Sequence, residues 1–301
     1  MDQQDTRAVS SPNTLPRRSL MGQFGVGAAA VMAAGAVAAG GVTLGSTPAA
    51  AQAAVTDADI LNFALNLEYL EAEFYIRAFL GQGLSASDRG GVGGAGGFVL
   101  GGSQVPFKTA AIFEYAQKLT IDEVNHVRFL RRALGPAAVA APNIDLLNSF
   151  NALAAAAGLI PAGTQFNPFA DEVSFLLGAF IFEDVGVTAY AGAAALLQNP
   201  AYLSAAASIL AIEAYHGGAV RTALGMLGQQ AAANAISAVR AKAGGGNDQG
   251  LSVGNLQINI SPSDGDSLAF RRTTTQVLGV VYNGRPTGGG FFPNQVNGTI
   301  R

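Results

Sequence analysis

The chain has only two histidines, and each lies three residues after a glutamate. The two pairs are Glu123/His126 and Glu213/His216. Because an α-helix has about 3.6 residues per turn, residues i and i+3 lie on the same face. Each pair therefore offers a carboxylate and an imidazole to one point in space. Two such helices facing each other, with carboxylates from two more helices, form a two-metal site in a four-helix bundle.

Composition allows a large buried core and excludes several kinds of site. Half of the residues are hydrophobic, and the formal net charge is −3. The chain has no cysteine, which excludes disulfides, iron–sulfur clusters and zinc–cysteine sites. It also lacks the clustered basic residues of a nucleic-acid-binding protein, so we expect no nucleic-acid partner.

Residues 1–53 have the order of parts found in a twin-arginine export signal. Arg17-Arg18 precedes an uncharged Gly/Ala/Val run over 22–44, and Ala51-Gln52-Ala53 follows as a small-x-small cleavage site. We therefore expect a periplasmic or extracellular protein that keeps no stable membrane span after cleavage. An uncleaved anchor is the alternative, because the run exceeds the roughly 18 residues that can span a bilayer. The abundance of Gly and Ala favours cleavage.

Helical periodicity predicts an all-α fold built on four long helices. The first, from about Asp57 to Leu80, begins with a capping-box pattern at Thr56 and Asp59, and Gly81 ends it. The second is expected over 106–135, the third over 168–198 and the fourth over 200–227, with shorter helices at 146–157 and 229–242. The connection between the third and fourth helices is very short, whereas about 30 residues separate the second from the third. This pattern predicts a four-helix bundle with one long crossover over 54–243.

Two segments lack helical periodicity. Residues 81–105 are rich in glycine and predict a long loop within the bundle. From residue 244 the composition shifts to Gly, Asn, Ser and Thr, which predicts a mostly irregular C-terminal extension over 244–301. The alternation at 256–260 suggests a short strand, and Thr273 could cap a short helix over 272–281. We expect this extension to pack on the bundle or to mediate assembly.

The first and third helices must supply the remaining carboxylates. The third helix offers Glu183 in an otherwise apolar stretch, and a buried carboxylate without a partner is costly. The first helix offers Glu68 or Glu71. Tyr190 lies seven residues after Glu183, and Tyr75 lies seven after Glu68.

Seven residues is close to two helical turns, so each tyrosine shares a face with its glutamate. In an antiparallel bundle each phenol would lie near the ligand of the opposite helix and could orient that carboxylate by a hydrogen bond. Glu71 has no such tyrosine and points to the edge of the core, so we favour Glu68. Glu73 is expected on the solvated side.

The predicted ligands are four carboxylates and two imidazoles, from Glu68, Glu123, His126, Glu183, Glu213 and His216. Oxygen and nitrogen ligands in this proportion suit two Fe or Mn ions and disfavour copper and zinc. Four carboxylate charges would balance two divalent ions. The alternatives are histidines with backbone partners, a Glu183 paired with a buried Arg128 or Arg221, and tyrosines that only pack.

The helix over 61–75, of sequence LNFALNLEYLEAEFY, resembles the ferritin-like superfamily, more narrowly its ferritin-like-domain branch related to desiccation-related proteins. The segment from Arg272 to Tyr282 is similar to the C-terminal segment of that branch. The resemblance covers about residues 56–285. It implies metal ligands at Glu68, Glu183 and the two Glu-x-x-His pairs. The glycine-rich loop, the export signal and the long tail depart from cage-forming ferritins and argue against an iron-storage cage.

We therefore expect an exported protein with a dinuclear Fe or Mn site that reacts with O2 or peroxide, or oxidises ferrous iron, in stress protection. Ferroxidase and peroxidase or catalase activities all suit such a site. The alternative is a structural desiccation or envelope protein in which the metal site is structural or vestigial. A homo-oligomer is compatible with either hypothesis. The sequence does not distinguish Fe from Mn, because the two metals share ligands.

Overall fold

The computed structural model describes residues 55–161 and 163–301. The export signal predicted over 1–53 lies outside these residues.

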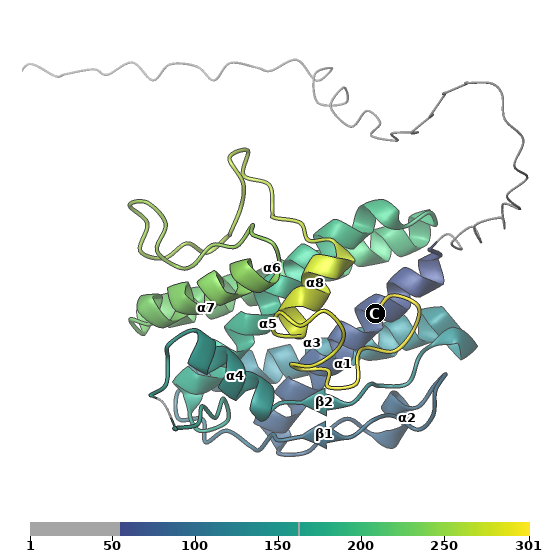
Figure 1. Cartoon of the computed structure of the whole chain (residues 1–301), viewed down its shortest axis with the longest axis horizontal. Helices are drawn as coiled ribbons and strands as arrows, with labels where there is room; N and C mark the ends of the chain where they lie inside the picture. Colours follow the sequence, from purple (N-terminus) through teal and green to yellow (C-terminus); the bar gives the residue numbers. More distant parts are fainter. Residues whose placement is uncertain (1–54, 162) are drawn as a thin grey trace, which may run out of the picture. The chain divides into compact units, whose positions relative to one another are not determined.

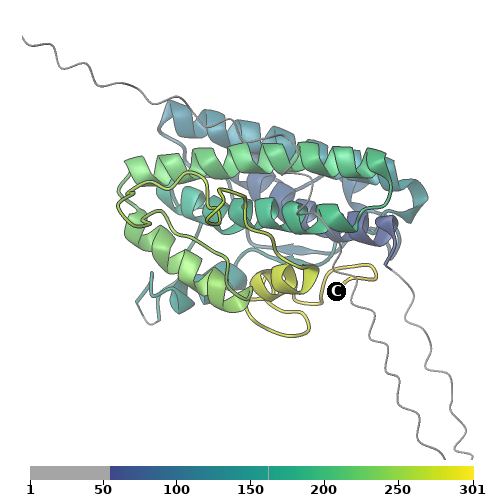
Figure 2. The same ribbon diagram turned by 90° about the horizontal axis from the view of Figure 1, so that it is seen from above.

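Four long helices form the bundle, namely α1 (Asp57–Leu80), α3 (Ala110–Leu134), α5 (Glu172–Ala193) and α6 (Pro200–Met226). Helix α1 packs along α3, and α5 packs along α6 (Figures 1 and 2). The α1–α3 pair is antiparallel, since the backbone carbonyl of Tyr75, near the end of α1, accepts a hydrogen bond at 3.1 Å from the hydroxyl of Thr120, in the first half of α3. The all-α bundle predicted from the sequence is confirmed.

Local capping explains where these helices begin and end. Thr56 and Asp59 form a capping box at the start of α1, and Gly81 ends it in the left-handed conformation at φ 73°. Helix α3 begins at Ala110, four residues later than predicted. The backbone N–H groups of Lys108 and Thr109 donate to the Glu172 carboxylate, which holds this segment outside the helix.

The long crossover between α3 and α5 contains a 3₁₀ turn at Gly135–Ala137, strand β2 (Ile144–Asp145) and helix α4 (Asn148–Ala156). Strand β2 pairs in parallel with β1 (Val99–Leu100), which lies in the glycine-rich segment after the short helix α2 (Ala86–Arg89). The α5–α6 connection is much shorter and contains the 3₁₀ turn Ala194–Leu196. The glycine-rich segment is therefore anchored to the crossover by a two-stranded sheet.

After α7 (Gln230–Ala243), the extension runs along the bundle and forms helix α8 (Thr274–Val281), which begins with a Thr273–Gln276 capping box. The short strand predicted over 256–260 was wrong. The Asn259 carbonyl accepts a hydrogen bond from the Arg221 side chain, and the Asn259 N–H donates to Leu251. The backbone groups of Asn259 are therefore hydrogen-bonded to partners other than a neighbouring β-strand.

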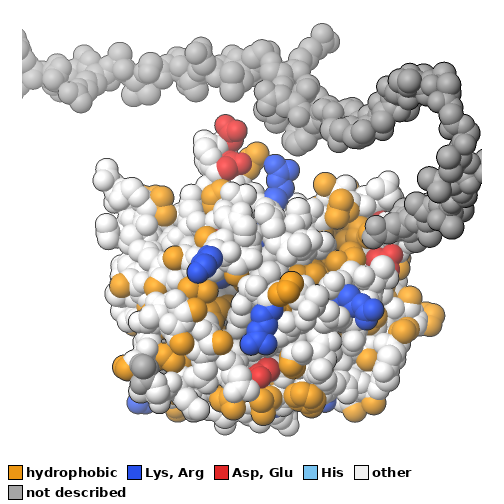
Figure 3. Space-filling view, viewed as in Figure 1, with side chains coloured by type: hydrophobic (Ala, Val, Ile, Leu, Met, Phe, Trp, Pro, Cys, Tyr) orange, Lys and Arg blue, Asp and Glu red, His pale blue; other side chains and the backbone are white. Residues whose placement is uncertain are grey.

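Aromatic packing holds the centre of the core, where Phe74 of α1 contacts Phe175 and Phe182 of α5 and Phe150 of α4. Within the described residues one segment, Glu172–Leu196, is long and apolar enough to span a membrane, but 83 % of its most apolar window is buried inside the protein. The segment consists of α5 and the 3₁₀ turn that follows it. Figure 3 shows charged side chains scattered thinly over the face that carries α7 and α8.

Candidate metal centre

The bundle brings all six predicted ligands together, although they come from four helices. Their ligand atoms form two groups, in each of which the atoms lie within 4.8 Å of one another. One group contains Glu68, Glu123, His126 and Glu213, and the other contains Glu123, Glu183 and His216. All six side chains are buried. The two groups share one residue, as expected for two neighbouring ions joined by a carboxylate.

Glu123 is the shared residue, and its two oxygens face different histidines. Its Oε2 lies 3.1 Å from Nδ1 of His126, and its Oε1 lies 3.0 Å from Nδ1 of His216. Glu123 and His126 meet because they are one turn apart on α3, whereas His216 reaches the same carboxylate from α6. The Glu123 carboxylate therefore lies between the two histidines.

The other three carboxylates complete the two positions. Glu68 Oε2 and Glu213 Oε1 lie 3.3 and 3.6 Å from Nδ1 of His126. Glu183 Oε2 lies 3.4 Å from Nδ1 of His216. Both histidines therefore turn Nδ1 toward the centre.

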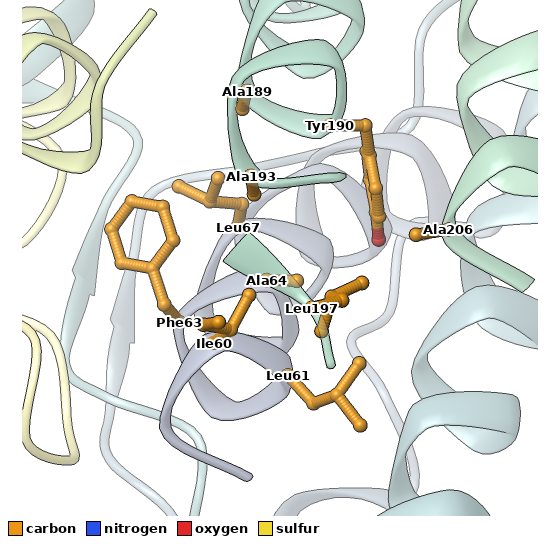
Figure 4. A pocket seen from close by; sticks show the side chains of 10 residues that line it. All are labelled: Ile60, Leu61, Phe63, Ala64, Leu67, Ala189, Tyr190, Ala193, Leu197 and Ala206. Atoms are coloured by element: carbon orange, nitrogen blue, oxygen red, sulfur yellow. The ribbon is translucent and has the colours of Figure 1, made fainter. Parts of the chain in front are cut away.

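Two buried tyrosines contact the carboxylates from behind. The Tyr75 hydroxyl donates to Glu183 Oε1, and the Tyr190 hydroxyl donates to Glu68 Oε1. In each carboxylate the other oxygen remains turned toward the histidines. Tyr190 also borders a cavity of about 20 Å³ that only apolar and aromatic side chains line (Figure 4). The tyrosines thus fix the carboxylates while apolar packing surrounds them.

Unpaired polar atoms indicate that this donor set fits metal ions. Eleven buried side-chain atoms of the described residues have no hydrogen-bond partner, and six of them belong to the ligand residues: Glu68 Oε2, Glu123 Oε1, Glu183 Oε2, both Glu213 oxygens and His216 Nδ1. Buried polar atoms without a partner are costly and uncommon in native proteins. Carboxylate oxygens and imidazole nitrogens are suitable ligands for Fe and Mn. Bound ions would satisfy these atoms at once.

Without metal, the charged groups of the centre shift one another's pKa values. Burial raises the pKa of Glu68 to about 7. Burial opposes the charged form of both histidines, but the surrounding carboxylates outweigh it and raise the pKa of His126 to about 11 and that of His216 to about 12. Burial alone would raise the pKa of Glu123, but its hydrogen bonds and charge interactions with the two histidines hold it below the usual value. Protons therefore occupy the centre where metal ions would bind.

The two histidines differ in the residue that faces the outer side of the ring, away from the centre. Nε2 of His216 lies 2.9 Å from Oδ2 of Asp122, the residue before Glu123. From its position beside Glu123, Asp122 could either orient a histidine or lie at the surface, and in the structure it contacts His216. The corresponding residue before Glu213 is Ile212, which has no hydrogen-bonding side chain. Only the His216 half therefore has this carboxylate support, which fixes the ring orientation and leaves Nδ1 for metal.

Glu71, the alternative to Glu68, is also buried but belongs to neither group of ligands. Burial raises the pKa of Glu71 well above its usual value, and repulsion from the charges of Glu123 and Glu183 raises it further. Glu71 lies beside Glu213, because both carboxylates reach the space next to Gly186. The expectation that Glu71 points to the edge of the core missed this proximity. The three-residue spacing of Glu68 and Glu71 could have indicated this, because residues i and i+3 lie on the same face of a helix.

Glu73 is buried, contrary to the prediction that it is solvated. Nε of Arg77 and Nε of Arg89 lie 2.9 and 3.5 Å from its carboxylate oxygens. The glycine-rich segment lies close against this side of α1: a Cβ added at Gly102 would be 2.4 Å from the Arg77 side chain. The loop therefore covers a face that the sequence pattern left to solvent.

The alternative partners considered for Glu183 are engaged elsewhere. Arg221 is paired with Asp184 at 2.7 Å, and Arg128 with Asp88 at 2.9 Å. The contacts of the Glu183 carboxylate are Tyr75 and His216. The structure therefore places Glu183 in the centre and not in an arginine pair.

Replacing Gly186 with alanine is expected to weaken metal binding. A Cβ at this position would be 2.2 Å from Oε2 of Glu213, so the carboxylate would have to move. We expect a loss of affinity on the order of 10- to 100-fold, as for other groups that position ligands. Metal titration of the apoprotein measures this loss.

Gly217→Ala is the matched control, because a Cβ there would meet only ordinary contacts, at 3.6 Å or more. Equal metal affinities in the two variants would contradict the prediction.

Comparison with known proteins assigns the fold to a family. A ferritin-like domain model matches residues 56–226. The chain is 29% identical over 269 residues to the ferritin-like catalase Nec2 of Nesocodon mauritianus, covering 81% of this chain and 84% of the relative. It is 30% identical over 272 residues to the desiccation-related protein PCC13-62 of Craterostigma plantagineum, covering 81% and 83%. This confirms the resemblance to desiccation-related proteins seen in the sequence. The chain belongs to the ferritin-like domain family.

Proposed function

We propose that this protein is an exported two-metal oxidoreductase that breaks down peroxide. The observation that carries the proposal is the Glu123 carboxylate, whose oxygens face the two histidines at 3.1 and 3.0 Å. One carboxylate between two sets of ligands is suited to holding two ions close together. Two Fe or Mn ions would supply reversible oxidation and reduction of the pair.

The chain's own residues would hold the ions and control access to them. His126 and His216 would each supply Nδ1, and Glu68 and Glu183 would each supply the oxygen that their tyrosine partner leaves free. The hydrogen bond from each tyrosine restricts rotation of its carboxylate. Burial of the six ligands keeps bulk water away from the centre.

The printed names of the relatives support peroxide chemistry and stress protection. One relative is named a ferritin-like catalase, which favours peroxide over ferrous iron as the substrate. The other is named a desiccation-related protein, which favours a stress-protective role and keeps the structural alternative open. The export proposal rests on the Arg17-Arg18 pattern and the cleavage site that follows it.

Metal analysis combined with a peroxide assay tests the proposal. The mature protein, purified from its native compartment, should contain two Fe or Mn ions per chain and should consume hydrogen peroxide. The Glu123→Ala/Glu213→Ala double variant should contain no stoichiometric metal and should lose the activity. Peroxide consumption that is equal with and without metal would favour the structural alternative. Peptide mapping of the mature N-terminus tests cleavage after residue 53.

Metal-free protein should become less stable as the pH rises. In the unfolded chain Glu and His release their protons near their ordinary pKa values, whereas folding raises that of Glu68 to about 7 and those of His126 and His216 to about 11 and 12. The folded state therefore binds more protons than the unfolded state from mildly acidic to alkaline pH. When the folded state binds more protons than the unfolded state, the free energy of unfolding falls as the pH rises, here by on the order of 1 kcal/mol per pH unit.

Urea denaturation of the metal-free protein at a series of pH values between about 6 and 9 measures this slope. Metal-loaded protein is the control, because bound ions replace the protons and should flatten the dependence. A metal-free protein that gains stability with rising pH would contradict the account of the centre.

A further inference from the structure

A groove runs between α3 and α6 and ends beside the metal centre. It encloses about 340 Å³. Its walls are mainly apolar and aromatic, formed by Tyr115, Leu119, Ile212, Tyr215 and Val220. Helices α3 and α6 lie along the same side of the bundle (Figure 2). The imidazole ring of His216, a predicted metal ligand, forms part of the groove wall.

The groove meets His216 on the side that faces away from the centre. Nε2 of His216 lies 2.9 Å from Asp122, and both residues line the groove. Nδ1 of the same ring lies 3.0 Å from Glu123 and faces the centre. A molecule in the groove would therefore be separated from the centre by one imidazole ring. It could exchange electrons with the centre but would not have to enter it.

Size and surface chemistry define what the groove can hold. Pockets for small organic molecules enclose about 300–1,000 Å³, whereas one water molecule takes up only about 30 Å³ of liquid volume and peroxide has one oxygen atom more. The groove is therefore much larger than peroxide requires. Apolar walls with two tyrosines favour an aromatic ring, which packs well against other rings.

The polar end of the groove favours a ring that carries a hydroxyl group. The Asp122 carboxylate is bound by His216 through Oδ2 and by Lys118 through Oδ1, at 2.6 Å. Each carboxylate oxygen can accept more than one hydrogen bond. A hydroxyl donor at the inner end of the groove can therefore be satisfied by Asp122, while the ring contacts Leu119 and Val220.

We propose that the α3–α6 groove binds a phenol that serves as the electron donor for peroxide reduction. This inference rests on the proposed function and adds a second substrate to it. Two phenols each lose one electron and one proton as their O–H bonds break. One hydrogen peroxide gains two electrons and two protons as its O–O bond breaks. The products are two phenoxyl radicals and two water molecules, so the reaction balances without another reactant.

The test uses 2-methoxyphenol and two matched variants of α6. Ala219 lines the groove, so Ala219→Leu should fill it. Ala207 is an exposed residue of the same helix that does not line the groove, so Ala207→Leu is the control. Ligand-observed NMR measures binding of 2-methoxyphenol to metal-loaded and metal-free protein, and absorbance measures its peroxide-dependent oxidation.

We expect Ala219→Leu to raise the Kd for 2-methoxyphenol by about tenfold or more in both forms, equivalent to about 1.4 kcal/mol. The KM for its oxidation should rise in parallel, and Ala207→Leu should behave as the unmodified chain does. Metal content checks that both variants keep the centre. Binding that is absent, or equal in both variants, would overturn the proposal.

The two proposals can fail separately. If peroxide is consumed but 2-methoxyphenol neither binds nor is oxidised, the groove proposal fails and the proposed function stands. If 2-methoxyphenol binds in the groove but peroxide is not consumed, the proposed function fails and the electron-donor role fails with it. Oxidation of 2-methoxyphenol that Ala219→Leu does not slow would place its site elsewhere and would also overturn the groove proposal.

Discussion

Replacing Glu123 with alanine is expected to abolish metal binding at both groups of ligands. Its carboxylate lies within 3.1 Å of Nδ1 of His126 and of Nδ1 of His216, so each position loses a ligand. Without it, the two positions also lose the group that joins them. Loss of a group that only supports a ligand costs about 10- to 100-fold in affinity, so we expect loss of the shared ligand to cost more. Peroxide consumption should fall with the metal content.

Elemental analysis of the purified variants measures this effect, and three further substitutions make the result specific. Glu114→Ala removes an exposed carboxylate from the same helix and should leave the metal content unchanged. Glu68→Ala should lose metal, whereas Glu71→Ala should retain it, because Glu68 lies in the ligand group and Glu71 does not. Full metal content in Glu123→Ala would contradict the assignment of a shared ligand. Loss of metal in Glu71→Ala but not in Glu68→Ala would reverse the choice between them.

The parts of the fold that depend on local sequence were predictable. The Thr56–Asp59 capping box and Gly81 defined the first helix, because caps and left-handed glycines act within one turn. The spacing of the two Glu-x-x-His pairs and the seven-residue Glu–Tyr repeats depends only on helical periodicity. For that reason the structure brings together the residues that these patterns singled out.

Features that depend on contacts between distant segments were not predictable. Glu73 was expected on the solvated side because the pattern of α1 does not reveal that the glycine-rich segment brings Arg89 to it. Asp122 contacts His216, which is 94 residues away. The segment 256–260 alternates as a strand does, yet its Asn259 carbonyl is bound by Arg221. In each case a partner that is distant in sequence takes part, so the local pattern alone could not decide the outcome.

Replacing Asp184 with asparagine is expected to be strongly destabilising, although Asp184 is not a ligand. Its Oδ2 accepts hydrogen bonds from Arg221 and Arg240, both at 2.7 Å. Both guanidinium groups are fully buried. Arg240 also pairs with Asp248 at 2.8 Å, and Arg272 pairs with the other oxygen of Asp248 at 2.6 Å. These five residues form one buried network that joins α5 and α6 to α7 and the C-terminal extension.

The network has three arginines and two aspartates, so removal of one negative charge leaves Asp248 alone to balance the three. An unbalanced buried charge costs about 3–5 kcal/mol when one partner of a buried pair is removed. Asparagine keeps the size and one acceptor oxygen, so we expect a loss of about 3 kcal/mol in the free energy of unfolding. Asp266→Asn, at an exposed position of the extension, is the control and should change it by less than about 0.5 kcal/mol.

Urea denaturation measures the loss, and hydrogen exchange locates it. Because Asp248 and Arg272 belong to the extension, loss of Asp184 should increase exchange in α7 and over 244–281 more than in α1 and α3. Metal-loaded protein should show the same pattern, since the network contacts the bundle through Asp184 and Arg221 and uses none of the six ligands. A stability equal to that of the unmodified chain would mean that the two arginines find new partners. An increase in exchange confined to α1 and α3 would mean that Asp184 stabilises the metal centre and not the attachment of the extension.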